Sequence, residues 1–105
     1  MDKAKKNRLA AAGWRTGDAA DFLDLTAEEA AFVELKLALA DYLRKVRTKR
    51  GWTQLQVARR LGSSQSRVAK MEAADASVSL DLLVKALLAL GASRGELGAV
   101  IAKAA

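Results

Sequence analysis

The sequence contains no cysteine, no histidine and no proline. Without cysteine the chain can form neither disulfides nor thiolate metal sites, and without histidine it lacks the commonest general base and a frequent metal ligand. No apolar run approaches the ~20 residues that a membrane span requires, and no long apolar stretch follows the basic residues 1–9. No nucleophile–base pair stands out either. We therefore predict a cytoplasmic protein that is not an enzyme, contacts no membrane and needs no metal and no cofactor.

What the chain does contain is apolar residues, at 51% of its 105 positions, and charge that is unevenly distributed. This length and composition predict one domain with one core. Residues 17–42 carry seven acids and one lysine, whereas residues 43–70 carry nine basic residues and no acid, within a net charge of +6. Taken alone, the basic segment fits a polyanion-binding surface and an ordinary solvated helix surface equally well.

Helix starts are marked by serine or threonine followed three residues later by glutamate or glutamine, the pattern of a capping box. It occurs at Thr26–Glu29, Thr53–Gln56 and Ser93–Glu96. Ser64 and Ser79 can cap two further helices, and glycines at 51, 62 and 91 can end the helices before them. No strand-like alternation is present. These signals predict an all-α fold with helices near 27–50, 54–61, 65–73, 80–90 and 94–105.

Weaker signals place short helices at 2–12 and 18–23. They predict an N-terminal extension over residues 1–25, with the main domain over 26–105.

The segment from Gly51 to Glu72 has the spacing of a helix-turn-helix, in which one helix is offered to the DNA major groove. Ala58 is small where the two helices must cross, and Gly62 tolerates the positive φ that the turn needs. Val57, Leu61, Val68 and Met71 can all face inward at consistent spacing. A generic helical hairpin would meet some of these requirements by chance, but a DNA-binding motif explains all of them together.

If Val68 and Met71 point inward, helical geometry turns Ser66, Ala69 and Lys70 outward, with Gln65 and Arg67 beside them. Glutamine can form two hydrogen bonds with adenine, and lysine or arginine can bond guanine O6 and N7. The alternative for each residue is plain solvation of a surface helix. Arg59 and Arg60 on the preceding helix suit phosphates or solvent better than bases.

Thr53-Gln54, Val57-Ala58, Leu61-Gly62, Gln65-Ser66, Val68 and Met71-Glu72 resemble the Xre-type, lambda/Cro repressor-like helix-turn-helix family. The resemblance runs from about Ala38 to Leu97. It implies a bundle of about five helices that binds operator DNA as a homodimer. The sequence departs from the family at residues 73–76, where the family often has a glycine and a polar residue.

The resemblance also implies roles for individual side chains. Gln54 would contact a phosphate and the side chain of Gln65, and Gln65, Ser66 and Lys70 would read base edges. Arg67 would contact a base or a phosphate, and an Arg47–Glu72 pair would be structural. The full set predicted to contact DNA is Thr53, Gln54, Arg59, Ser64, Gln65, Ser66, Arg67 and Lys70.

The predicted function is a sequence-specific repressor whose two recognition helices, about 34 Å apart, read a near-palindromic operator. The apolar stripe of Leu97, Val100 and Ile101 is a candidate dimer contact. The alternative, that these residues pack in the core of the monomer, fits the sequence equally well. The layout also resembles small Xre-type antitoxins, which repress their own operon and hold a toxin protein. The alternative is a protein-interaction module whose acidic residues from Asp18 to Glu34 bind a basic partner such as a toxin.

Overall fold

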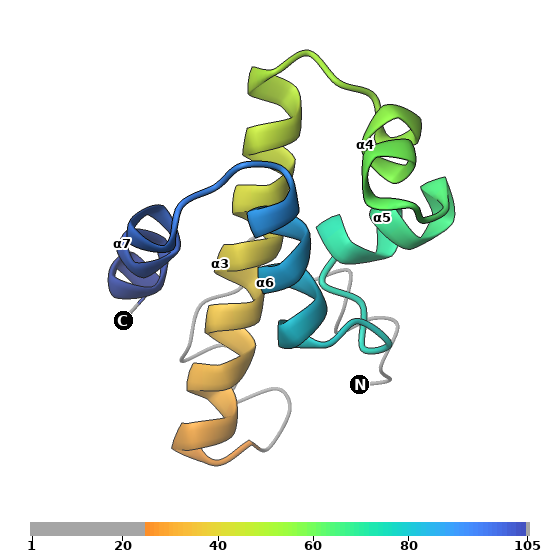
Figure 1. Ribbon diagram of the computed structural model, residues 1–105. Helices are drawn as coiled ribbons and strands as arrows, with labels where there is room; N and C mark the ends of the chain where they lie inside the picture. Colours follow the sequence, from red (N-terminus) through yellow and green to blue (C-terminus); the bar gives the residue numbers. More distant parts are fainter. Residues whose placement is uncertain (1–24, 105) are drawn as a thin grey trace.

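The computed structural model describes residues 25–104, and over these residues it contains five α-helices and no strand. The helices are α3 (Ala27–Lys49), α4 (Gln54–Leu61), α5 (Gln65–Glu72), α6 (Leu80–Ala89) and α7 (Arg94–Ala104) (Figure 1). The predicted all-α five-helix bundle is confirmed, with helix ends close to those expected. The short helices predicted at 2–12 and 18–23 lie outside the described residues.

Each predicted capping box is formed. The Thr26 hydroxyl accepts the Glu29 N–H at 3.1 Å, while the Glu29 carboxylate accepts the Thr26 N–H at 3.0 Å. The same reciprocal pair forms at Thr53–Gln56 and at Ser93–Glu96. Because these bonds use amides that a helix start leaves without partners, the helices begin where the sequence predicts.

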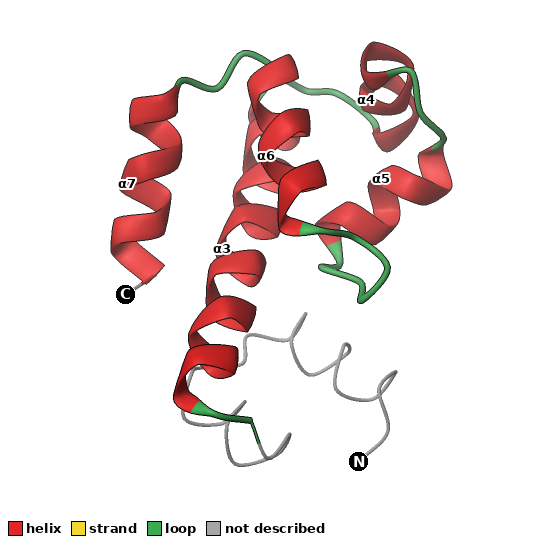
Figure 2. Cartoon of the chain, turned by 60° about the horizontal axis from the view of Figure 1, so that its bottom comes forward, coloured by secondary structure: helices red, strands yellow, loops and turns green. Residues whose placement is uncertain are grey.

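The long helix α3 runs through the molecule, with α4 and α5 on one side of it and α7 on the other (Figures 1 and 2). α6 lies against α3 between these two groups. The largest fully buried side chains come from four of the helices and form one core: Leu39, Leu43, Val57, Val68, Met71, Leu83 and Leu87. This core holds the α4–α5 hairpin at a fixed place on α3 and α6.

Apolar residues on the first half of α3 are less buried than those further along. Leu39 and Leu43 are fully buried, whereas Phe32 is 49% exposed and Val33 and Leu35 are half-buried. Within residues 25–104, no helix is long and apolar enough to cross a membrane.

Candidate nucleic-acid interface

The α4–α5 hairpin has the inward residues that its spacing predicts. Val57 and Ala58 of α4 and Val68 and Met71 of α5 are all buried in the core. Gly62 adopts φ 64° at the turn, where the Ser63 N–H donates to the Ala58 carbonyl at 2.8 Å. A side chain at this φ would be strained, so glycine is the suitable residue for so tight a reversal.

With Val68 and Met71 fixed in the core, the polar residues of α5 are turned away from it. Gln65, Ser66 and Lys70 are exposed, and Ala69 is half-buried. The helix therefore presents an amide, a hydroxyl and an ammonium group that can hydrogen-bond with base edges.

Two hydroxyls of the predicted DNA-contacting set are engaged in capping. Thr53 Oγ1 accepts the Gln56 N–H, and Ser64 Oγ accepts the Arg67 N–H, each at 3.1 Å. Both residues are exposed N-caps, so the N-termini of α4 and α5 lie at the surface. Helix N-termini favour anions because several amides point outward there.

Behind this surface, Arg47 and Glu72 form a bidentate ion pair that joins α3 to the end of α5. Arg47 Nε and Nη2 each donate to one Glu72 carboxylate oxygen, and Arg47 Nη1 donates to the Trp52 carbonyl at 3.1 Å. The Glu72 side chain is only 6% exposed. Hydrogen bonding to Glu72, opposed by partial burial, raises the pKa of Arg47. The structural role predicted for this pair is confirmed.

Gln54 makes a different contact from the one that the resemblance implies. Its Nε2 donates to Glu72 Oε1 at 3.2 Å, so it joins the Arg47–Glu72 pair and does not bond Gln65 in this structure. The contact fixes the half-buried Gln54 side chain at the start of α4. Sequence spacing could not reveal it, because Gln54 and Glu72 are brought together only by the hairpin.

A second contact that the sequence does not indicate involves Trp52, in the loop between α3 and α4. The guanidinium carbon of Arg60 lies 4.0 Å from the centre of a Trp52 ring, and that of Arg50 lies 5.1 Å away. Both are cation–π contacts. Arg60 is thus held against Trp52, whereas Arg59 is exposed and has no such contact.

The loop after α5 is tied down by Asp75. Its carboxylate accepts hydrogen bonds from the Ser77 hydroxyl and the Ser77 N–H, which together lower the pKa of Asp75. Its carbonyl accepts Lys36 Nζ at 2.9 Å, which links the loop to α3. The chain departs from the family pattern at this loop, yet the loop is well anchored.

A family model described as helix-turn-helix matches residues 43–97, which is more than half of the chain. The chain belongs to the Xre-type, lambda/Cro repressor-like helix-turn-helix family. This family consists of DNA-binding regulators and is not typically enzymatic, so the protein is a DNA-binding regulator. A search of curated proteins and a search of solved structures each found no match.

The family match begins well inside α3, since the helix starts at Ala27 and the match starts at Leu43. The helix-turn-helix family therefore accounts for the last turns of α3, for the α4–α5 hairpin and for α6, but not for the first half of α3.

The match ends at Leu97, the first apolar residue of α7. Of the three residues predicted as a dimer contact, Leu97 belongs to the core and Val100 packs against it. Ile101 remains 40% exposed. For Leu97 the core placement, which the sequence left open as the alternative, is the correct one.

Proposed function

We propose that this DNA-binding regulator is a sequence-specific repressor that binds a near-palindromic operator as a homodimer. The observation that carries the proposal is the arrangement of α5, whose apolar face is buried while Gln65, Ser66 and Lys70 are exposed. One chain offers one such helix. Two helices related by a two-fold axis would read successive major grooves, and occupation of the operator would exclude the polymerase.

We assign the DNA contacts by the position of each side chain. Gln65, Ser66 and Lys70 read base edges, and Arg67 reaches a base or a phosphate. Thr53, Gln54, Ser64 and Arg59 lie at the ends and flank of this surface and contact phosphates. The DNA-binding unit in this proposal spans residues 26–105, with residues 1–25 as an extension.

The test is binding to an operator selected from a random duplex library. The double variant Gln65→Ala plus Lys70→Ala should lose the preference for the selected sequence, since each base contact contributes ~1–3 kcal/mol. Arg59→Ala should weaken selected and random DNA equally and flatten the salt dependence.

Lys103→Ala, which removes an exposed cation from α7, is the matched control and should bind as the parent does. An equal loss on selected and random DNA in the double variant would refute the assignment of base readers.

A second candidate function, an antitoxin that also binds a toxin protein, is favoured by the first half of α3. This half lies outside the family match, exposes Phe32 and carries the exposed acids Glu28 and Glu29. A basic partner such as a ribonuclease toxin would complement that surface.

The antitoxin proposal is tested with the product of the neighbouring gene, if that gene encodes a short basic protein. Co-purification should survive Gln65→Ala plus Lys70→Ala and be lost in Phe32→Ala plus Glu28→Lys. If the α3 variant holds the partner as firmly as the parent does, the partner does not bind this face.

A further inference from the structure

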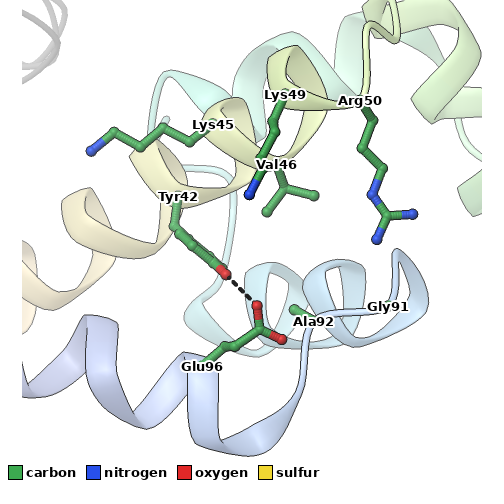
Figure 3. Close-up of a pocket in the computed structure, with 8 residues that line it drawn as sticks. All are labelled: Tyr42, Lys45, Val46, Lys49, Arg50, Gly91, Ala92 and Glu96. Atoms are coloured by element: carbon green, nitrogen blue, oxygen red, sulfur yellow. Dashed lines mark hydrogen bonds between the residues drawn. The ribbon is translucent and has the colours of Figure 1, made fainter.

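A cavity of about 370 Å³ lies between the last turns of α3 and the loop that joins α6 to α7. The α6–α7 loop and α7 lie on the side of α3 away from α4 and α5 (Figure 1). Its lining residues are Tyr42, Lys45, Val46, Lys49, Arg50, Gly91, Ala92 and Glu96 (Figure 3). The family assignment and the proposed DNA contacts leave this cavity without a role.

Two cations are directed into the cavity from the end of α3: Lys49 is its last residue and Arg50 is its C-cap. Figure 3 shows Lys49 and Arg50 extending toward the α6–α7 loop, while Lys45 points away from it. Lys45 is paired instead with Asp41 at 3.0 Å. Among the described residues, no carboxylate lies within salt-bridge distance of Lys49 or Arg50. The charge of Lys49 nevertheless helps to lower the pKa of Glu96, after the hydrogen bonds from Ser93 and Tyr42.

The wall of the cavity opposite α3 is formed by Glu96 and by the small residues of the α6–α7 loop. Glu96 accepts the Tyr42 hydroxyl at 3.0 Å and the Ser93 N–H at 2.8 Å, so both of its oxygens are engaged. The loop wall is formed by Gly91 and Ala92, which have little or no side chain. A Cβ on Gly91 would lie 3.5 Å from Arg50 Nη2, an ordinary van der Waals contact, so the guanidinium lies against this wall; glycine is required by the positive φ of 98°.

We propose that this cavity binds a phosphate-bearing small molecule, with Lys49 and Arg50 as its anion-binding groups. The cavity lies in the size range of small-ligand sites. Lysine and arginine both bind phosphate, one as a point charge and one through a planar fork of donors. A tetrahedral phosphate presents oxygens to two cations that approach from different positions, whereas a carboxylate presents two oxygens in one plane. A bound ligand would join α3 to the loop that leads into α7.

The experiment titrates inorganic phosphate into the full chain at constant ionic strength and follows backbone amide shifts by NMR. Saturable shifts are expected at Gly91, Ala92, Lys49 and Arg50. Lys49→Gln should weaken phosphate binding about tenfold, because a hydrogen bond to a charged group is lost. Lys103→Gln removes the same charge from an exposed position on α7 that does not line this cavity, and should bind as the parent does. Melting curves of both variants establish that they are folded.

Several results would overturn the proposal. Equal weakening by Lys103→Gln and Lys49→Gln would mean that only diffuse charge attracts the anion. The absence of any saturable shift would mean that there is no site. Shifts confined to α5 and the start of α4 would place phosphate on the DNA-binding surface. Acetate that binds as tightly as phosphate would remove the preference for phosphate.

One further arm separates a small molecule from the DNA backbone as the source of the phosphate group. Operator affinity should change less than twofold in Lys49→Gln. A loss as large as that of Lys70→Gln would instead assign Lys49 to DNA.

Discussion

At the scale of single residues, Ala74 has a strained backbone conformation. It is the one residue there other than glycine with positive φ, at 52°. The Asp75 N–H bonds the Lys70 carbonyl and the Ala74 N–H bonds the Met71 carbonyl, which is the Schellman pattern that usually places glycine at this point. Ala74 occupies the place where the family often has that glycine. A left-handed conformation costs an alanine about 1–2 kcal/mol.

Ala74→Gly should therefore stabilise the protein by about 0.5–1 kcal/mol, because relief of this strain exceeds the entropy that glycine adds to the unfolded chain. Urea denaturation measures the change. Ala73→Gly is the control, since Ala73 has an ordinary right-handed conformation at φ −85° and should gain nothing from glycine. A stabilisation of equal size at both positions would show that φ is not the cause.

The Arg47–Glu72 pair is the other residue-scale feature on which the fold depends. Arg47→Ala should lower the free energy of unfolding by roughly 3 kcal/mol, because it leaves the buried Glu72 carboxylate without its partner. Arg44→Ala removes a pair with Asp41 in which the two side chains are 55% and 42% exposed, and should cost less than about 1 kcal/mol. Chemical denaturation of both variants tests this, and similar costs would contradict it.

At the scale of elements, α5 shows how one helix end can serve stability and binding together. Ser64 Oγ accepts the Arg67 N–H at 3.1 Å and so begins the helix. The same residue is exposed at the helix end that we expect to face a phosphate. Ser64 therefore has two roles, the capping of α5 and the proposed phosphate contact. A single alanine substitution would remove both.

Two substitutions of Ser64 can separate these roles. Ser64→Ala should lower stability by about 1 kcal/mol through loss of the cap. Ser64→Asp should keep the cap and the stability, yet weaken DNA binding because its carboxylate repels the phosphate. Thermal melts and operator titrations of both variants provide the measurements. Undiminished operator affinity in Ser64→Asp would remove Ser64 from the DNA contacts.

At the scale of the whole molecule, the lack of histidine shapes the dependence of stability on pH. Hydrogen bonds from Ser93 and then Tyr42 lower the pKa of Glu96 from its ordinary 4.5, and hydrogen bonds from Thr26 do the same for Glu29. Burial, and then the hydrogen bond to Glu96, raises the pKa of Tyr42 above 10.0. Among the described residues with a shifted pKa, none belongs to a residue type whose ordinary pKa lies between 4.5 and 10.0.

Stability should therefore fall only at the two ends of the pH range. A lowered folded pKa stabilises the protein above the unfolded value, near 4.5 for glutamate, and this contribution is lost as the pH falls through the folded pKa. The raised pKa of Tyr42 acts in the opposite sense, so its contribution is lost as the pH rises above 10.0 through the folded value. Melting temperature against pH should be nearly flat between these limits. Glu96→Gln should reduce both losses, and an unchanged profile would show that the Tyr42–Glu96 bond contributes nothing.

The proposed homodimer is also a property of the whole molecule. Ile101 is a large apolar side chain of α7 that the core leaves exposed, so Ile101→Glu should raise the dimer dissociation constant by about tenfold or more. Sedimentation equilibrium measures it. Phe32→Glu, an equivalent change at an exposed position on α3, is the control and should leave the dimer intact. If Ile101→Glu has no effect on the dimer, α7 is not the contact.

Local signals explain which features could be predicted. The capping boxes, the stops at Gly51, Gly62 and Gly91, and the inward side of the hairpin all depend on groups a few residues apart. A pattern over so short a distance is visible in the sequence, because helical geometry fixes which residues meet. The resemblance to the helix-turn-helix family added the long-range Arg47–Glu72 pair, which spacing alone would not reveal.

By itself, then, the sequence determined where the helices begin and end and which side of α5 is polar, since both depend on contacts within one or two helical turns. Only the tertiary structure decided which side chains from different helices and loops contact one another. It engaged Gln54 with Glu72, stacked Arg60 on Trp52, buried Leu97 in the core and opened a cavity between Lys49 and Gly91. The physical reason is the same in each case: these groups are far apart in the chain, and packing around one core determines which of them meet.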